Sequence, residues 1–334
     1  MGTRFAGVDA ARGLAIVGML WAHTAADGTR QALADGRSAV LFATLAGCSI
    51  GLLTGGARPG LGRDRRDALV SVALRGLVLV ALGLALWTLG TPIAVVLDTY
   101  GVLFLILLPV VFAPVPVVAG VALVAALAGP LIVAAVGEDL QTPFTAQRLA
   151  HLPAEWLVTG YYPGVVVAAY LCAGLLVARA GLARRRTLVA MVGAGAASSA
   201  LGYGGAALAG LDASAHANTT AEVLGSGGLA LAIIGALELL CSSPSTGRIA
   251  GAVLRPLIAA GRMPLTIYTG QLLALAVWLT TPAAGDPPWI ESWSLLAGLL
   301  IGSLTFASLW QRFVGRGPLE DLLTRLTTVR RVQT

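Results

Sequence analysis

The sequence predicts an all-α integral membrane protein, a bundle of about ten membrane-spanning helices with both termini in the cytoplasm. Hydrophobic residues make up 57% of the 334 residues and charged residues only 11%, and the mean hydropathy is +0.84. This composition leaves too little polar surface to cover a water-soluble globule. Apolar runs of about 18 to 23 residues recur, a length that crosses ~30 Å of hydrocarbon as a helix. The 42 glycines fit such a bundle, because small residues let helices approach closely in lipid.

The apolar runs follow one another without an inserted soluble domain, so we expect a single domain over residues 1–334. The segment Ala113–Pro116 separates the fourth run from the fifth, because proline cannot continue a helix. One broken helix is the alternative there, which leaves the count between nine and eleven. The ten predicted spans are 10–26, 38–56, 68–89, 92–112, 116–137, 159–179, 187–210, 222–242, 258–281 and 293–314.

The distribution of arginine predicts the orientation. All 22 basic residues are arginines; 17 of them lie in the tails or in loops on one side, and two lie inside spans. The opposite loops hold only three, Arg30, Arg37 and Arg148. Because positive loops stay in the cytoplasm, His23 is expected near the extracytoplasmic face. The net charge of +6 therefore reflects topology, and we expect no nucleic-acid partner.

The three cysteines, Cys48, Cys172 and Cys241, all lie in apolar context and show no paired spacing. Neither a disulfide framework nor a metal site is indicated. We expect them to be buried as small hydrophobic side chains.

The first span carries two ionisable residues, Arg12 and His23, in apolar surroundings. Eleven residues correspond to almost three helical turns and roughly 16 Å of rise, so both side chains are predicted on one face. Asp9 lies one turn before Arg12 and can neutralise it. Ionisable residues within a membrane usually face a protein interior or a wet cavity and indicate function. The alternative is a snorkelling arginine with an interfacial histidine.

A cluster of arginines follows the second span, from Arg63 to Arg66, and Arg75 lies about two turns inside the third. Guanidinium groups bind phosphate oxygens bidentately. The cluster therefore suggests a site for a phosphorylated cytosolic ligand. The alternative is an orientation signal of the usual positive-inside kind.

Several segments in this order and spacing resemble the heparan-α-glucosaminide N-acetyltransferase family. The N-terminal region, 1–165, resembles it at Val8–Gly13, Asp35–Ser38 and Leu45–Ser49. The C-terminal half, 166–334, is similar to the bacterial YeiB-like branch, with matching stretches at Gly261–Tyr268, Trp310–Phe313 and Gly317–Glu320, and a further one just before it at Tyr161–Pro163.

Related membrane acyltransferases carry an Arg, ten residues and a His in the first helix, and an Arg-x-x-Arg after the second. Arg12 with His23, and Arg63 with Arg66, match both patterns. The resemblance implies that an acyl group passes from cytosolic acyl-CoA to an acceptor on the far side, and we expect acetyl from acetyl-CoA. Arg12, Arg63, Arg66 and Arg75 would then bind the phosphates of the donor.

One departure from the family concerns the histidine. The lysosomal enzymes have a functional His in the loop beyond the first helix, where this chain has Ala25 and Ala26. His23 would have to act instead, as a base or as a transient acyl carrier. Asp27 or Asp35 would orient it.

Acyl transfer also needs donors for an oxyanion. The candidates are Arg37, Ser38 and backbone N–H groups at the start of the second span, because a helix N-terminus favours anions.

The acceptor site is predicted in the outer loops. His216 is a candidate for acceptor binding or for a second acid or base. The alternative is that it belongs to a loop whose only role is to cap a helix. In that case Thr219 or Thr220 is the N-cap of the eighth span, and Glu222 lies in its first turn. Walls for a sugar-like acceptor are predicted from four residues, which could equally form an interfacial aromatic belt. These are Glu155, Trp156, Tyr161 and Tyr162.

These observations favour an acyl-CoA-dependent acyltransferase of the bacterial cytoplasmic membrane, without a metal, acting on a sugar, glycolipid or other envelope acceptor. Its expected surroundings are membrane lipids, and the sequence leaves a homodimer open. The runner-up is a transporter or flippase, which the plain apolar middles of the fifth, seventh and tenth spans disfavour. A third alternative is a non-catalytic membrane scaffold. It is disfavoured because it does not explain why His23 and Arg12 lie on one helix face.

Overall fold

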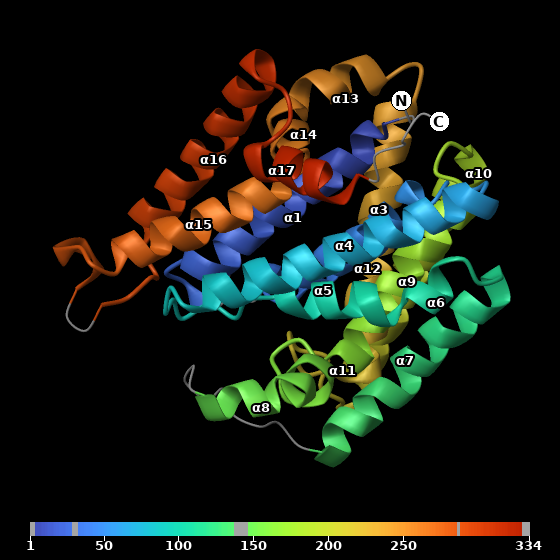
Figure 1. Ribbon diagram of the computed structural model, residues 1–334, viewed down its shortest axis with the longest axis horizontal. Helices are drawn as coiled ribbons and strands as arrows, with labels where there is room; N and C mark the ends of the chain where they lie inside the picture. The colour runs from blue at the N-terminus through green and yellow to red at the C-terminus, as the bar shows by residue number, and fades with distance from the viewer. Residues whose placement is uncertain (1–3, 29–32, 137–145, 286–287, 329–334) are drawn as a thin grey trace.

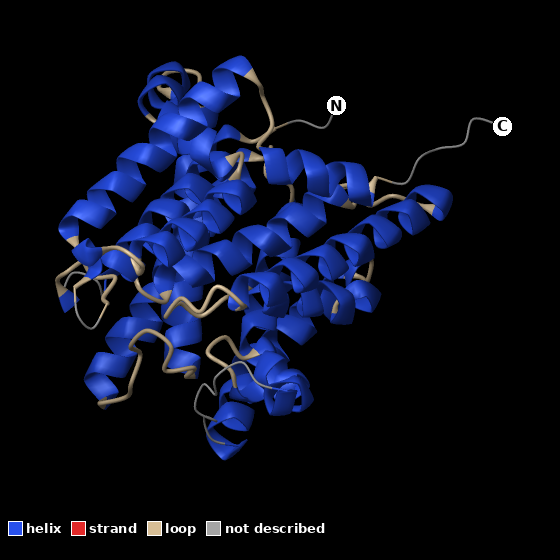
Figure 2. Ribbon diagram, turned by 60° about the vertical axis from the view of Figure 1, so that its left-hand side comes forward, coloured by secondary structure: helices blue, strands red, loops and turns tan. Residues whose placement is uncertain are grey.

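The computed structural model describes residues 4–28, 33–136, 146–285 and 288–328, without the side chains of 146–149. Every regular element in these ranges is a helix (Figures 1 and 2), as predicted. The first half contains α1 (Ala6–Thr24), α3 (Arg37–Leu53), α4 (Gly62–Trp87), α5 (Leu97–Ile106), α6 (Leu108–Val111), α7 (Val115–Val136), α8 (Ala146–Ala154) and η1 (Glu155–Thr159). The second half contains α9 (Gly164–Ala180), α10 (Arg185–Ser199), η2 (Ala200–Gly204), α11 (Gly205–Ala209), α12 (Thr220–Ser242), α13 (Gly247–Val253), α14 (Arg255–Gly261), α15 (Pro264–Trp278), η3 (Pro282–Ala284), α16 (Trp293–Phe313) and α17 (Pro318–Thr327).

Five helical stretches in the described chain are long and apolar enough to cross a membrane: α4, α7, the continuous stretch Arg185–Ala209, α12 and α16. A sixth is added if the pair Ala150–Thr159 and Gly164–Ala180, bent by 58°, is one span. Together these helices indicate a membrane protein. Three predicted spans contain shorter apolar helices, α3, α5 and α15. The count of ten therefore stays a prediction.

Proline explains where one predicted span is interrupted. Pro264 occupies the first turn of α15, a position that proline favours because its missing N–H is not needed there. The predicted span 258–281 is therefore divided into α14 and α15.

Both ends of the described chain lie at the same end of the bundle. Arg4 and Thr328 line one common cavity, which Arg316 also lines; we call this the Arg316 end. The opposite end, where α1 finishes and α12 begins, is called the His216 end. That the Arg316 end faces the cytoplasm stays a prediction. Of the arginines counted for that prediction, Arg30, Arg330 and Arg331 lie outside the described residues.

Two central helices, α3 and α9, cross with their backbones in contact. A Cβ atom added at Gly47 would overlap the carbonyl group of Leu171, and one added at Gly174 would overlap that of Thr44. Glycine at both positions therefore permits an approach that any side chain would prevent. Asp35 precedes α3 and Tyr162 precedes α9, so this crossing fixes the two segments relative to each other.

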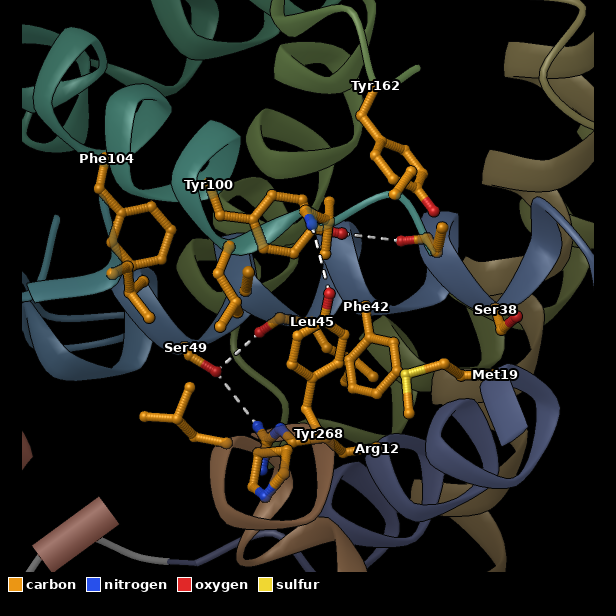
Figure 3. Close-up of a pocket in the computed structure, with 18 of the residues that line it drawn as sticks. Arg12, Met19, Ser38, Phe42, Leu45, Ser49, Tyr100, Phe104, Tyr162 and Tyr268 are labelled. Atoms are coloured by element: carbon orange, nitrogen blue, oxygen red, sulfur yellow. Dashed lines mark hydrogen bonds between the residues drawn. The ribbon is translucent and has the colours of Figure 1, made fainter. Parts of the chain in front are cut away.

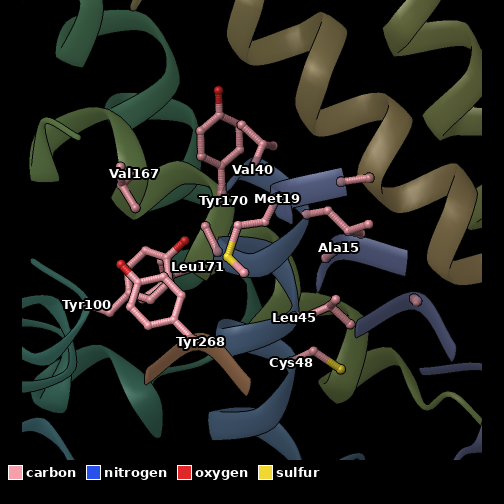
Figure 4. Close-up of a cluster of buried hydrophobic side chains, with 14 of the residues drawn as sticks. Ala15, Met19, Val40, Leu45, Cys48, Tyr100, Val167, Tyr170, Leu171 and Tyr268 are labelled. Atoms are coloured by element: carbon pink, nitrogen blue, oxygen red, sulfur yellow. The ribbon is translucent and has the colours of Figure 1, made fainter. Parts of the chain in front are cut away.

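The hydrophobic core lies where α1, α3 and α9 meet (Figure 4). Leu45, Cys48, Leu171 and Cys172 are buried there, so two of the three cysteines pack as predicted. Figure 4 also shows Tyr100 and Tyr268 side by side at the edge of this cluster, with Met19 nearby. At this edge the packed core passes into a cavity.

Candidate functional site

A cavity of about 330 Å³ runs between α1, α3, α5 and α15 (Figure 3). We call it the central cavity. His23 and Asp35 line it toward the His216 end, whereas Arg12 and Arg75 line it toward the Arg316 end. The prediction that Arg12 and His23 share one helix face is thus confirmed, and Met19 lies between them on that face.

The middle of the central cavity has a mostly apolar wall. Figure 3 shows Phe42 from α3 and Phe104 from α5 beside the tyrosines Tyr100 and Tyr268. The Tyr100 hydroxyl donates to the carbonyl oxygen of Ala39 at 3.0 Å, and the Tyr268 hydroxyl accepts the backbone N–H of residue 96 at 3.3 Å. These bonds tie α5 to α3 and α15, so the wall is built from side chains with fixed positions.

Arg12 is the centre of a hydrogen-bonded group at the Arg316 end. Its guanidinium donates to Asp9 at 2.9 Å, to the carbonyl oxygen of Gly261 at 3.0 Å and to Ser49 at 3.1 Å. Arg262 donates to the other carboxylate oxygen of Asp9 at 3.1 Å. The predicted Asp9–Arg12 pair is confirmed, and one carboxylate serves two arginines. This group therefore keeps a positive charge.

A second cavity of about 540 Å³ adjoins the first and is called the vestibule. Arg75, Arg262 and Glu320 line both cavities. Within the described structure, the Nε of Arg75 is buried without a hydrogen-bond partner. At the Arg316 end of the two cavities, the arginines that line them or contact their walls outnumber the carboxylates five to three, so an anion is the complementary ligand there. They are Arg4, Arg12, Arg75, Arg262 and Arg316, against Asp9, Asp67 and Glu320.

Glu320 is already occupied by protein contacts. Its carboxylate accepts the backbone N–H groups of Leu265 at 2.7 Å and Thr266 at 3.0 Å, and the Thr266 hydroxyl at 2.6 Å. The carboxylate thus caps the N-terminus of α15, where negative charge is favoured, and holds α17 beside the vestibule. These hydrogen bonds of Glu320 all go to the first turn of α15.

At the His216 end, a strained loop presents His216. This residue and Asn218 have positive φ angles of 62° and 51°, a conformation that costs non-glycine residues about 1–3 kcal/mol each. The carboxylate of Glu222 accepts the backbone N–H of His216 at 2.8 Å and that of Asn218 at 2.7 Å. Thr219 is the N-cap of α12 and accepts from the Glu222 backbone, as predicted. The loop conformation is therefore held from the first turn of α12.

The ring of His216 has partners on two sides. Its Nε2 donates to the carboxylate of Asp35 at 3.0 Å. The rings of Tyr161 and Tyr162 lie 4.1 Å and 5.5 Å from it, centroid to centroid. Burial opposes ionisation of Asp35, but the bond and charge of His216 and the N–H of Gly36 together lower the pKa of this carboxyl below its usual value. Asp35 and His216 thus form a pair with an ionised carboxylate.

His23 contacts Gln271 rather than Asp35. The side-chain nitrogen of Gln271 lies 2.8 Å from Nδ1 of His23, and Gln271 is only 2% exposed. When the amide nitrogen donates, the neutral imidazole carries its proton on Nε2. The predicted orientation of His23 by Asp35 is thus replaced, in the described contacts, by a glutamine on α15. Asp35 instead orients His216.

The N-terminus of α3 faces the same end of the central cavity. Gly36, Ser38 and Ala39 line it, and α3 has no side-chain cap hydrogen bond. The Ser38 hydroxyl donates to the carbonyl oxygen of Ala34 at 2.6 Å. Of the predicted oxyanion donors, Ser38 and the start of α3 therefore line the same cavity as His23, whereas Arg37 lines a different hollow described below.

Several predicted site residues do not line the central cavity. Asp27 is absent from its wall, and Arg63 and Arg66 are exposed on α4 outside both cavities. The indole of Trp156 donates to the buried carboxylate of Asp98 at 2.8 Å, and Glu155 lies beside it on η1. Of the four residues predicted to form a wall for the acceptor, Tyr162 lines the central cavity. Tyr161 packs against His216.

Sequence reasoning did not single out Arg262, Arg316 or Gln271 as site residues. Two of them had a signal, because Gln271 is a lone amide within an apolar span, and Arg262 precedes Pro264 at a helix start. Both arginines had been assigned to the positive-inside pattern alone. Only the packing of α14, α15 and α17 shows that they converge with Arg75.

The fold and cavity define a helical bundle of membrane type, with an arginine-lined opening at one end and a His/Asp group at the other. Residues 174–330 match a family described as "Protein of unknown function (DUF418)". YeiB-like proteins belong to that family, so the match agrees with the resemblance assigned to the C-terminal half. No curated protein matches the chain.

Proposed function

We propose that this protein is a membrane acyltransferase that moves an acyl group, such as acetyl, from cytosolic acyl-CoA to an acceptor on the opposite side. The observation that carries the proposal is the central cavity, which connects Arg12 and Arg75 with His23 and Asp35. Arginines at one end suit the phosphates of the donor. Titratable groups at the other end suit the chemistry of transfer.

In this proposal the donor phosphates bind at the vestibule, which is the cytoplasmic opening. Arg75 is supported by its unpartnered Nε, and Arg262 and Arg316 are supported by their place on the vestibule wall. Arg63 and Arg66, proposed from the sequence, lie on the exposed first turn of α4. The donor site is therefore assigned to the vestibule arginines together with Arg12.

The Asp35–His216 pair takes the proton of the acceptor. The acceptor O–H or N–H gives its proton to the pair, and its oxygen or nitrogen attacks the thioester carbonyl. The C–S bond then breaks, and the pair returns this proton to the CoA thiolate, which leaves as the thiol. His23, with Nε2–H as donor and Gln271 holding Nδ1, stabilises the developing oxyanion. This role differs from the base predicted for His23 from the sequence.

Calorimetry with acetyl-CoA on the purified protein tests the donor site. Arg75→Gln and Arg262→Gln should each weaken binding about ten- to a hundredfold, because a charge-assisted hydrogen bond contributes about 1.5–3 kcal/mol. Arg66→Gln is the matched control and should bind as the unaltered protein does. Loss of affinity in Arg66→Gln alone would move the donor site to the exposed cluster on α4.

Turnover of the histidine variants tests the roles at the other end. His216→Ala should lower transfer by about 10²–10⁴, the usual range for a positioned acid or base, with acetyl-CoA affinity unchanged. His23→Gln, which keeps an N–H donor, should retain more activity than His23→Ala. An active His216→Ala protein beside an inactive His23→Gln would restore His23 as the base. Solute transport without acyl transfer would support the transporter reading instead.

A further inference from the structure

A separate groove of about 200 Å³ lies on the flank of the bundle, between α1, α3 and α12. We call it the lateral groove. Its walls are apolar except for Ser38 and one guanidinium, that of Arg37 at its polar end. Ser38 lines this groove and the central cavity alike. The full lining consists of Leu14, Ala15, Gly18, Leu33, Ala34, Arg37, Ser38, Leu41, Leu229, Ala230 and Ile233.

We propose that the lateral groove binds the hydrocarbon chain of an anionic membrane lipid, and that this lipid is the acyl acceptor. The inference rests on the acyltransferase proposed above. It adds the class of acceptor, a lipid with a phosphate and a free hydroxyl or amine, which reaches the site from within the bilayer.

The depth of the groove fits one leaflet. Its deepest residue on α1 is Leu14, nine residues before His23, which corresponds to about 14 Å of helix rise. Half of a ~30 Å hydrocarbon core is about 15 Å. Leu33, at the His216 end, is 73% exposed and Leu14 is 37% exposed, so the groove opens sideways where apolar chains would surround the protein.

The position of Arg37 supplies charge complementarity. Its guanidinium lies 5.0 Å above the ring of Tyr203, whose hydroxyl is hydrogen-bonded to Ser226 on α12 at 2.7 Å. The guanidinium therefore lies at the polar end of the lateral groove. An anionic headgroup whose hydrocarbon chain is buried in the groove requires a positive charge at this place. Arg37 follows Asp35 by two residues, so the polar end of the groove and the Asp35–His216 pair belong to the same end of the bundle.

A glycine keeps the partition between the groove and the central cavity thin. A Cβ atom at Gly18 would lie 3.2 Å from the Cβ of Ser38, closer than ordinary packing. Without a side chain there, Ser38 borders both spaces. In this proposal the headgroup reaches the donor past Ser38, the one described side chain that borders both spaces, while the hydrocarbon chain stays in the groove.

Lipid binding by the full chain, measured by native mass spectrometry, tests the proposal. Phosphatidylglycerol should bind in preference to phosphatidylcholine of the same chain length. Arg37→Gln should reduce that preference about tenfold, as expected for one lost charge-assisted contact, whereas Arg185→Gln, on an exposed arginine of α10, should not. Ile233→Trp should fill the groove and reduce binding of both lipids, while Leu208→Trp, on the exposed face of α11, should leave both unchanged.

Retained preference in Arg37→Gln together with unchanged binding in Ile233→Trp would overturn the assignment. A second readout follows labelled acetyl from acetyl-CoA into the lipid fraction. Lipid binding without any transfer from acetyl-CoA would overturn the acyltransferase while the groove remains a lipid site. Transfer to a water-soluble acceptor by a protein that binds no lipid would overturn the lipid assignment alone.

Discussion

The strained loop that carries His216 gives a quantitative prediction for Glu222, which is 5% exposed. Its carboxylate accepts the backbone N–H groups of His216 and Asn218. A hydrogen bond to a charged group contributes about 1.5–3 kcal/mol, so losing both removes at least about 3 kcal/mol of local stability. Because 1.4 kcal/mol is tenfold, Glu222→Ala should open the loop at least about a hundredfold more often. Glu222→Gln keeps one carbonyl acceptor and should show about a tenfold effect.

Amide hydrogen exchange in lipid nanodiscs measures this opening residue by residue. The amides of His216 and Asn218 should exchange faster in Glu222→Ala, by the factor just given. The amide of Val223 is the internal control, because it donates to the backbone carbonyl of Thr219 and does not use the carboxylate. Unchanged exchange at His216 and Asn218 would refute the reasoning. Equal acceleration at Val223 would show that α12 frays instead.

Two further predictions concern pH and packing. Folding lowers the pKa of Asp35, so the stabilising contribution of its carboxylate is complete above the ordinary pKa and is lost as the pH falls through the lowered value. The difference in melting temperature between the unaltered protein and Asp35→Asn should therefore shrink below about pH 4. A difference that stays constant with pH would contradict this prediction. Gly47→Ala should destabilise the bundle, because the new Cβ meets the Leu171 carbonyl. Gly298→Ala, with open space around it, should instead stabilise α16 by up to about 1 kcal/mol. Denaturation of both variants in detergent measures the two changes in stability, and changes of the same sign would refute the close crossing.

The helical class and the face shared by Arg12 and His23 could be predicted because both depend on local periodicity. Helix rise and spacing place two residues of one helix without knowledge of any partner. The cap of α12 was likewise local: a hydroxyl two or three residues before Glu222 narrowed it to Thr219 or Thr220, and the structure has Thr219. In each case the information lies within one or two helical turns.

The partners of the titratable groups could not be predicted, because they come from helices distant in the chain. His216 is 181 residues from Asp35, and Gln271 is 248 residues from His23. The sequence suggested Asp27 or Asp35 for His23 because they are near it in the chain, but α15 brings an amide to that ring. The vestibule arginines show the same limit, since Arg262 and Arg316 reach Arg75 only through the folding of α14 to α17.

The backbone contact of α3 with α9 also has a consequence for how such a protein could diversify. Asp35 and Tyr162 directly precede these two helices. Because the backbones touch at Gly47 and Gly174, α3 and α9 stay in a fixed register. The segment 212–219, in contrast, contributes His216 from a loop that is held mainly by Glu222 and Thr219. Under the proposed function, exchanging this loop between homologues should therefore change which acceptors are used, while the register of the central helices and the donor site stay the same.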